Sequence, residues 1–398
     1  MNILLSMLKF PPDFTGAGLR TAALYSNLQK NGRIGKVLVL TSSQGGRTNP
    51  IYRVNGLDVF SVNGNIYPAP ESTLFSRVKK TFYVLRSSLR ISRQYMRCHR
   101  EFDIIHTVDS SWLSTLVAWL AFFTGRPLVK EIVLLGCDDP ASIKKSKGPL
   151  SRYLYLFPFR YAKLIIVISP PLKEACVKCG ISAKKIWCRH NPVYFLNGAE
   201  VLNGKDNIEL EFSKPTILWV GAFGKRKNVE FLLEAARFLR GSLQLLFIGP
   251  VTDEGYFLGI RKRANELMSQ NKEMSVGFPG MISDRRYLRS VYEKSRLFWF
   301  SSHNEGLGNV VIESLLCGTP VVALPVNGVM DSLISQPRDG RIVDTDDPRV
   351  FAQAVNFCLS QNYNRAEIEL NAKKRFDPLK IEDGYAERFD SIRREKRR

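Results

Sequence analysis

The stretch LFWFSSHNEGLGNVVIESLLCGTPVVALP, residues 297–325, places an apolar run on each side of a short amphipathic segment. Leu297–Ser301 and Pro320–Ala323 predict buried strands, and Val311–Cys317 predicts a helix between them. A strand–helix–strand unit implies a parallel sheet with helices packed against it. In such sheets ligands bind beyond the carboxyl ends of the strands, and the glycine-containing turn lies at such an end.

The turn and the helix after it carry groups suited to a phosphorylated ligand. Glu305 and Glu313 are eight positions apart, a little over two helical turns, which keeps both acids near one site. Glycines let the backbone approach a ligand, and amides at a helix start suit a phosphate. The residues concerned are Gly306, Gly308, Asn309 and Val310. Taken alone, the pattern also fits an ordinary strand–helix–strand unit with two surface glutamates.

Strand and helix patterns alternate along all 398 residues, which is long enough for two domains. We expect an α/β protein with doubly wound domains at 1–195 and 213–375, joined by a polar linker at 196–212. Residues 376–398 are expected to form a C-terminal helix with a basic tail that returns toward the first domain.

Charge separates the two halves. The chain has 58 lysines and arginines against 37 aspartates and glutamates, a formal net charge of +21. The first 195 residues hold 28 basic and 10 acidic residues and so carry +18 of that charge. A basic surface implies an anionic partner such as nucleic acid, acidic lipid or phosphate.

The sequence favours a cytoplasmic protein. Seven cysteines without the spacing of a disulfide scaffold suggest reduced thiols. The N-terminus, MNILLSMLKFPPDF, lacks a basic segment before its apolar run and predicts a strand rather than a signal peptide. The longest apolar stretch, Trp112 to Phe123, has 12 residues, too few to span a bilayer. We therefore expect any membrane contact to be peripheral.

Six ordered segments resemble the retaining glycosyltransferase family four, which has the GT-B fold. The E-x7-E pattern at 305–313 and the CGTPVV after it resemble the family's signature. The other segments are WVGAFGKRKNVEFLLEAARFL (219–239), PPDFTGAGLRTAALYSNLQKNG (11–32), FDIIHTVD (102–109) and IVISPPLKEACVKCGISAKKIWCRHNPV (166–193). The resemblance implies two Rossmann-like domains facing a central cleft, a nucleotide-sugar donor bound mainly by the second domain, no cofactor and no obligatory metal.

The resemblance also implies roles for individual residues. Glu313 is expected to hold the ribose hydroxyls of the nucleotide, and Glu305 to contact the transferred sugar. Lys227, with Arg226 beside it, is expected to neutralise the diphosphate leaving group by charge-assisted contacts. The glycines expected near the donor are Gly16, Gly18 and Gly221.

Two positions depart from the family pattern. Ala222 stands where the family commonly has an arginine, and Lys225 or Arg226 is a candidate to replace it. The histidine that often follows the strand PLVKEIVLLGCDDP is absent. The candidates to activate the acceptor in its place are Glu131, His106, Asp138 and Asp139.

Residues 74–100 predict a basic amphipathic helix with eight lysines and arginines and no acid before position 101. Arginines at steps of four, three and four mark one face: Arg86, Arg90, Arg93 and Arg97. Val78, Phe82, Leu85, Leu89 and Met96 mark an adjacent apolar face. Such a helix can lie on an anionic membrane. Alternatively, its apolar stripe packs on the sheet and the arginines are solvated.

Three other patterns are expected to be structural. Cys176, Cys179, Cys188 and His190 resemble a zinc ligand set, but the family match passes through them without a metal. The D-x-D at 344–346 precedes Asp347-Pro348, a typical helix start. The Gly16-Ala17-Gly18 run has Thr21 where a dinucleotide fingerprint has its third glycine.

We therefore expect a retaining glycosyltransferase that moves a sugar from a nucleotide-diphosphate sugar to a lipid-linked or membrane-proximal glycan. This activity would serve polysaccharide or glycolipid biosynthesis at the inner face of the membrane. A soluble transferase or a sugar-nucleotide epimerase acting on a small substrate is the alternative within the same fold. A nucleic-acid-binding protein is a remote alternative, because no nucleic-acid motif accompanies the charge.

Overall fold

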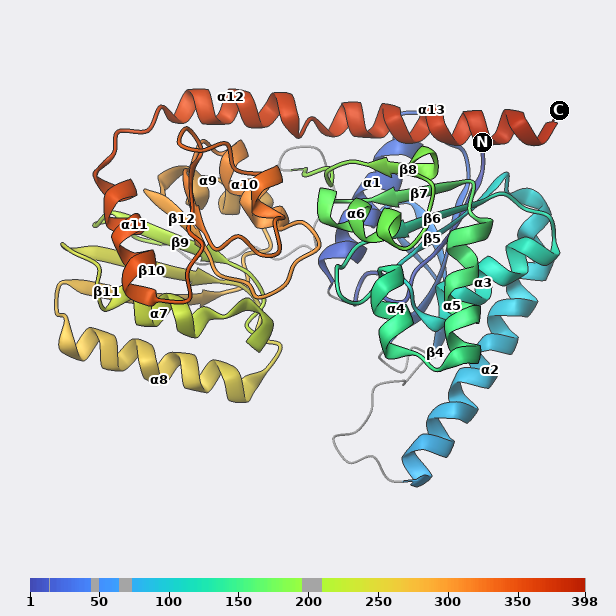
Figure 1. Cartoon of the computed structure of the whole chain (residues 1–398), viewed down its shortest axis with the longest axis horizontal. Helices are drawn as coiled ribbons and strands as arrows, with labels where there is room; N and C mark the ends of the chain where they lie inside the picture. Colours follow the sequence, from blue (N-terminus) through green and yellow to red (C-terminus); the bar gives the residue numbers. More distant parts are fainter. Residues whose placement is uncertain (14, 44–49, 64–73, 195–209, 398) are drawn as a thin grey trace. The chain divides into compact units, whose positions relative to one another are not determined.

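The computed structural model describes residues 1–397 except 14, 44–49, 64–73 and 195–209 (Figure 1). The chain divides into two compact units, and each has its own sheet. The first unit contains residues 1–192 and 378–398, so the C-terminal segment belongs with the N-terminal half. The second unit contains residues 193–377. The predicted linker at 196–212 lies mostly outside the described residues.

The first unit has an eight-stranded sheet in the order β3-β4-β2-β1-β5-β6-β7-β8. Its strands are β1 (Ile3–Ser6), β2 (Val37–Ser43), β3 (Ile51–Val54), β4 (Leu57–Asn63), β5 (Ile104–Val108), β6 (Leu128–Ile132), β7 (Leu164–Val167) and β8 (Ile186–Cys188). All pairs are parallel except β3 with β4. The turn between those two is Asn55-Gly56, whose positive φ angles of 50° and 84° favour a tight hairpin. Our sequence reading missed this hairpin, although the Asn-Gly pair signals it.

Helices cover both faces of this sheet. They are α1 (Gly16–Lys30), α2 (Leu74–Cys98), α3 (Trp112–Phe123), α4 (Pro140–Ser146), α5 (Pro149–Tyr161), α6 (Pro170–Lys178) and α13 (Pro378–Arg397). Helices α1 and α13 share one core through side chains such as Tyr25 and Tyr385, both fully buried. The chain order and the contacts of α2 with α3, and of α3 with α5, place those helices together on the other face.

The second unit has a six-stranded parallel sheet in the order β11-β10-β9-β12-β13-β14. Its strands are β9 (Thr216–Val220), β10 (Leu243–Ile248), β11 (Met274–Gly280), β12 (Leu297–Phe300), β13 (Val321–Ala323) and β14 (Gly340–Ile342). Its helices are α7 (Val229–Ala236), α8 (Glu254–Gln270), α9 (Arg285–Lys294), α10 (Asn309–Leu316), α11 (Pro348–Ser360) and α12 (Arg365–Arg375).

Two groups of helices sandwich the second sheet, and α7, α8 and α11 share one core with it. Helices α9, α10 and α12 contact one another on the other face. The start of α11 confirms the prediction that the D-x-D segment precedes a helix start at Asp347-Pro348. The Asp347 carboxylate accepts the amide of Arg349, and Pro348 is the first helical residue.

No helix among the described residues is both long enough and apolar enough to cross a membrane.

Candidate functional site

The carboxyl ends of β9 and β12, which are paired neighbours, bring three predicted site residues together. Lys227 and Arg226 lie in the turn after β9, and Glu305 lies in the loop after β12. The Nζ of Lys227 lies 2.6 Å from Oε1 of Glu305, and Nη1 of Arg226 lies 2.9 Å from the same oxygen. The residues that the sequence assigned to the sugar and the leaving group therefore form one ionic cluster.

Glu305 is a buried carboxylate stabilised by its two cations. Only 8% of the residue is exposed. Burial alone would raise its pKa, but Lys227 and Arg226 outweigh burial and hold the pKa below the ordinary value for a glutamate. Glu305 is therefore ionised at neutral pH. Lys225, the other candidate to replace the missing arginine, is exposed.

Glu313 lies on α10 and is held by two side chains of α9. Its Oε1 accepts from Nη2 of Arg285 at 2.8 Å, and its Oε2 accepts from the hydroxyl of Tyr292 at 3.0 Å. Burial raises the pKa of Tyr292 well above its ordinary value, and the neighbouring Glu313 adds to this. The phenol therefore remains a donor. The sequence singled out neither residue, because no local pattern shows which helix packs beside Glu313.

The start of α10 depends on a glycine. Gly308 has φ +86°, and a Cβ atom there would lie 3.0 Å from Cε of Met330. Gly308 is the N-cap and has no capping side chain. The helix begins at Asn309, so the amides of Asn309 and Val310 belong to its first turn, and Gly306 before them is buried.

Gly221 follows β9 directly and packs against the ring of Trp219. A Cβ atom at Gly221 would lie 2.9 Å from that ring, and the Gly221 amide bonds the carbonyl of Ile248. Any larger residue would displace the loop that carries Lys227. Gly221 therefore has a packing role in addition to the predicted place beside the donor.

The ion-paired side chains of the predicted site carry an excess of one positive charge. Lys227 and Arg226 pair with Glu305, and Arg285 pairs with Glu313, which gives three cations against two carboxylates. This excess of positive charge attracts an anion, and a diphosphate matches the guanidinium and ammonium donors. The carboxylates can accept hydroxyl groups of a neutral sugar.

Residues 205–375 match the model of the family described as Glycosyl transferases group 1. This match covers less than half of the chain and lies within the second unit, which is thus similar to group 1 glycosyl transferases. A D-inositol 3-phosphate glycosyltransferase of Xylanimonas cellulosilytica is 26% identical over 172 residues, which cover 42% of this chain and 40% of that protein. The chain thus spans less than half the length of that relative.

A second relative comes from Campylobacter jejuni: the N-acetylgalactosamine-N,N'-diacetylbacillosaminyl-diphospho-undecaprenol 4-alpha-N-acetylgalactosaminyltransferase. It is 27% identical over 259 residues, which cover 63% of this chain and 67% of that enzyme. Among solved structures, Anabaena HepE in complex with UDP and glucose has a TM-score of 0.71 at 16% identity. That alignment covers 98% of this chain and 100% of HepE. The chain therefore has the GT-B fold.

In the first unit, the two predicted donor glycines begin α1 rather than forming a free loop. Thr15 caps the helix, and its hydroxyl accepts the amide of Gly18 at 3.0 Å. A Cβ atom at Gly18 would lie 2.7 Å from that hydroxyl and 3.0 Å from the carbonyl of Lys9. A Cβ atom at Gly16 would meet nothing within 4 Å. Of these two glycines, only Gly18 is thus required by the packing of the first unit itself.

Glu131 occupies a different environment from the one we expected of an acceptor-activating residue. It is 1% exposed, and its Oε1 lies 2.6 Å from Nη2 of Arg20 and 3.0 Å from Nη2 of Arg189. Its Oε2 accepts the hydroxyl of Tyr385, on α13, at 2.7 Å. Burial would raise the pKa of Glu131, but the two guanidiniums hold it well below the ordinary value. A carboxylate held in this way is a poor base, so we reassign Glu131 to a structural role.

His106 belongs to the same buried cluster. The side chain is fully buried, its Nδ1 pairs with the hydroxyl of Tyr25, and its Nε2 lies 3.4 Å from Oε2 of Glu131. Burial lowers its pKa below the ordinary value for histidine. The neutral ring sits under α1 and α13, beside Phe389 and Tyr385, and we reassign it to the core as well.

The remaining acceptor candidates lie after β6. Asp139 caps α4 by accepting the amide of Ser142 at 2.9 Å. The Oδ1 of Asp138 accepts the amide of Ser110 at 3.0 Å. Burial, reinforced by Asp109, raises the pKa of Asp138 to about 6. A pKa of about 6 lies near the range in which a general base works.

No group of three histidine, cysteine, aspartate or glutamate side chains in the described part of the chain could hold a metal ion. Cys176 ends up buried on α6, and Cys188 lies on β8.

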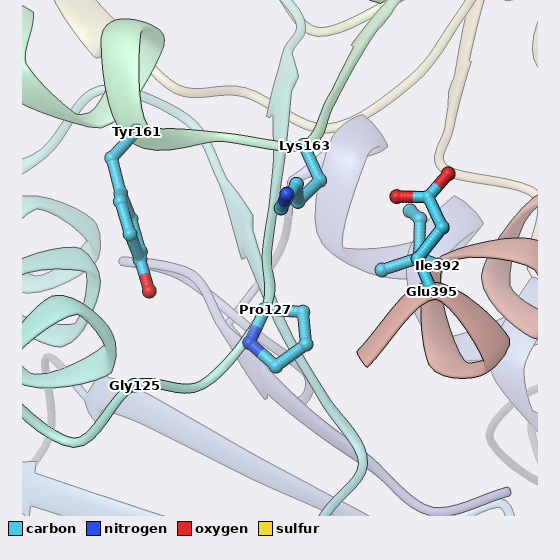
Figure 2. A pocket seen from close by; sticks show the side chains of 6 residues that line it. All are labelled: Gly125, Pro127, Tyr161, Lys163, Ile392 and Glu395. Carbon is cyan, nitrogen blue, oxygen red and sulfur yellow. The ribbon is translucent and has the colours of Figure 1, made fainter. Parts of the chain in front are cut away.

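The pocket in Figure 2 is not at the functional edge of its sheet. Its volume is about 170 Å³, and it is lined by Gly125, Pro127, Tyr161, Lys163, Ile392 and Glu395. Pro127 and Lys163 directly precede β6 and β7, so the pocket lies at the amino ends of these parallel strands. Ligand sites of open α/β sheets lie at the opposite edge.

Proposed function

We propose that the protein is a glycosyltransferase, which moves a sugar from a nucleotide-diphosphate sugar to a lipid-linked or membrane-proximal glycan. The reaction retains the anomeric configuration and requires no metal. The observation that carries the proposal is the cluster in which Lys227 and Arg226 share one oxygen of the buried Glu305. The cluster lies at the carboxyl edge of the second sheet, where such sheets bind ligands.

The cations of this cluster supply the positive charge that a metal ion would otherwise provide to the leaving group. As the bond between sugar and diphosphate breaks, negative charge develops on the leaving oxygen, and Lys227 and Arg226 stabilise it. Glu305 holds both cations in place before the donor arrives, so little reorganisation is needed. Glu313, oriented by Arg285 and Tyr292, accepts the ribose hydroxyls. The amides at the start of α10 add further donors for the phosphates.

Three observations support an acceptor at a membrane. The first 195 residues carry nearly all of the net charge. The arginines of α2 that we predicted as a membrane surface, Arg86, Arg90, Arg93 and Arg97, are all exposed. The Campylobacter relative bears a name that includes a diphospho-undecaprenol glycan. We place the enzyme at the inner face of the cytoplasmic membrane, in the assembly of surface polysaccharide or glycolipid.

A donor screen tests the proposal. The protein is heated with UDP-, GDP- and ADP-sugars in the presence of EDTA, and release of nucleoside diphosphate is followed at the same time. We expect one nucleotide series to raise the melting temperature and to be hydrolysed slowly without added metal. Loss of hydrolysis in EDTA, or no stabilisation by any donor, would contradict the proposal.

The acceptor and the stereochemistry need a second experiment. The donor identified above is incubated with polyprenyl-diphosphate-linked glycans and, as the matched control, with the same glycans lacking the lipid. We expect faster transfer to the lipid-linked form and an NMR coupling constant showing the donor's anomeric configuration in the product. An inverted product, or equal rates on both acceptors, would count against the corresponding part of the proposal.

A further inference from the structure

Large apolar side chains lie exposed on three neighbouring helices of the first unit. Each of them is at least 38% exposed, and the most exposed reach 74% and 75% at Phe123 and Leu150. The set comprises Phe82, Leu85, Leu89 and Met96 of α2, Phe122 and Phe123 of α3, and Leu150, Tyr153 and Leu154 of α5. We call these residues the three-helix apolar surface.

Direct contacts connect the three helices (Figure 1). The hydroxyls of Tyr95 on α2 and Thr124 at the end of α3 lie 2.8 Å apart. The indole nitrogen of Trp119 on α3 donates to the carbonyl of Leu154 on α5 at 3.2 Å. The rings of Trp119 and Phe157 stack with centroids 3.8 Å apart. The exposed side chains therefore belong to three helices that pack against one another.

Helix α2 packs on the unit through a side that the sequence did not single out. Ile91 and Tyr95 are fully buried, whereas the described members of the predicted apolar stripe are 53–62% exposed: Phe82, Leu85, Leu89 and Met96. The expectation that the stripe packs on the sheet is therefore wrong. At about 100° per residue, the exposed stripe and the arginine row lie side by side, both directed away from the buried side.

The arginine row is free to meet an external anion. All four arginines are exposed, and none has an ion-pair partner within the described ranges. Helix α2 contains no acidic residue. Tyr95 contacts Thr124 at the end of α3 and so marks the side of α2 that meets α3. Around the helix axis, Tyr95 lies nearer to the apolar stripe than to the arginine row. The apolar stripe is therefore the face nearer to α3, and the arginines lie beside it on the side away from α3.

We propose that the three-helix apolar surface inserts into the interfacial region of an anionic bilayer, with the arginine row lying on the lipid phosphates. The inference deepens the membrane-proximal acceptor proposed above and rests on it. Aromatic and aliphatic side chains beside a row of cations are the composition of surface-seated membrane helices. Each basic residue near an anionic leaflet adds attraction that salt weakens, whereas apolar insertion does not depend on salt.

A second copy of the chain fits this surface less well. A symmetric dimer applies the same patch to itself. Such a contact would bring two arginine rows together, and α2 offers no acidic side chain to separate them. An anionic lipid surface supplies the missing negative charge and covers the apolar residues at the same time.

Vesicle binding tests the two parts of the surface separately. The full chain is sedimented with vesicles of phosphatidylcholine alone and of phosphatidylcholine with phosphatidylglycerol, at low and at high salt. The variants are Phe123→Asp, Leu150→Asp and a quadruple replacement of Arg86, Arg90, Arg93 and Arg97 by Gln. Leu258→Asp on α8 of the second unit, where Leu258 is 62% exposed, is the matched control.

We expect Phe123→Asp and Leu150→Asp each to weaken vesicle binding roughly tenfold at both salt concentrations, because each removes a large apolar side chain from the contact. The quadruple arginine variant should lose the preference for phosphatidylglycerol and its salt dependence. Leu258→Asp should bind as the parent does. Equal loss in Leu258→Asp, or unchanged binding of both apolar variants, would overturn the inference.

Trp119 provides a direct readout of insertion. It is half-buried within the surface, while Trp219 and Trp299 are buried in the second unit. Lipids brominated near the headgroup should quench the fluorescence of the parent, and Trp119→Phe should lose most of that quenching. Quenching that is unchanged in Trp119→Phe would contradict insertion at this surface.

Two controls separate this inference from the proposed function. Donor hydrolysis without vesicles should be the same in the parent and in the Asp variants, since these side chains belong to the first unit, whereas Lys227 and Glu305 belong to the second. If hydrolysis is absent in the parent, the proposed function fails whatever the vesicles show. If light scattering shows a dimer that Phe123→Asp dissociates while vesicle binding is unchanged, the surface serves self-association and the membrane inference is wrong.

Discussion

Arg285 places its guanidinium 2.8 Å from the carboxylate of Glu313, joining α9 to α10 at the edge where the nucleotide is expected. Glu313 raises the pKa of Arg285 above its ordinary value, opposed in part by burial. Tyr292 occupies the other oxygen, so the carboxylate is held at both ends. A carboxylate fixed in this way presents its remaining lone pairs in one direction, which suits the paired hydroxyls of a ribose.

We expect Arg285→Ala to weaken binding of the nucleoside diphosphate by roughly 10- to 100-fold, the usual range for losing a hydrogen bond to a charged group. Arg285→Lys should restore part of the affinity. Calorimetry with the ribo- and 2′-deoxyribonucleotide gives the decisive comparison, because the parent should prefer the ribose form and Arg285→Ala should lose that preference. An unchanged preference would show that Arg285 does not act through Glu313.

Lys227 is the cation nearest Glu305, and its removal should affect the chemical step more than binding. We expect Lys227→Ala to lower kcat by roughly 10²- to 10³-fold, as when one preorganised donor is removed from a developing anion. Lys227→Arg keeps the charge and should retain more of the activity. Steady-state kinetics with the donor found in the screen measure both variants. A kcat of Lys227→Ala within twofold of the parent would remove Lys227 from the leaving-group role.

The sequence was sufficient to predict those strands and helices that local patterns of apolar residues determine. The strands at 297–300 and 321–323 and the helix between them follow from apolar runs, and both glutamates lie at the predicted edge. The ionic contacts of Glu313 could not be foreseen, because they depend on which helix packs beside α10. A pattern of residues four apart reveals one helical face but not the neighbour that the face meets.

Helix α2 also shows that residue spacing predicts the faces of a helix but not which face packs against the rest of the protein. The spacing of its arginines and apolar residues predicted a helix with two faces, and both exist. The packing face, with Ile91 and Tyr95, is a third, which has fewer apolar residues and carries no obvious signal. Glu131 is a further example, because a buried acid and a catalytic acid look alike until Arg20 and Arg189 are seen beside it.

The reassignment of Glu131 is testable by stability. Glu131→Gln leaves the guanidiniums of Arg20 and Arg189 buried without a carboxylate, which typically costs about 3–5 kcal/mol. We expect a clearly lower melting temperature for the first unit, while turnover per folded molecule at 20 °C stays near that of the parent. A large loss of turnover with an unchanged melting temperature would return Glu131 to acceptor activation.

The raised pKa of Asp138 makes a prediction about pH. The ordinary value is 3.8 and the folded value about 6, so the folded state binds the proton more tightly than the unfolded state. This contribution to stability is fully present below about pH 4 and is lost as the pH rises through 6. Asp138→Asn should remove that fall, which amounts to at most about 3 kcal/mol. Denaturant unfolding of both proteins from pH 4.5 to 7.5 measures it, and parallel curves would refute the assignment.

Gly16 and Gly18 form a matched pair that separates packing from ligand approach. A Cβ atom at Gly18 would lie 2.7 Å from the hydroxyl of Thr15, whereas one at Gly16 would meet nothing within 4 Å. We therefore expect Gly18→Ala to disturb the cap of α1 and lower the melting temperature, since losing such a cap costs about 1 kcal/mol. Gly16→Ala should leave the melting temperature unchanged.

If the diphosphate approaches the backbone at Gly16 during transfer, Gly16→Ala should still lower kcat/KM, because the methyl group occupies the space the donor needs. Normal kcat/KM in Gly16→Ala would exclude that close approach and leave donor binding to the second unit alone.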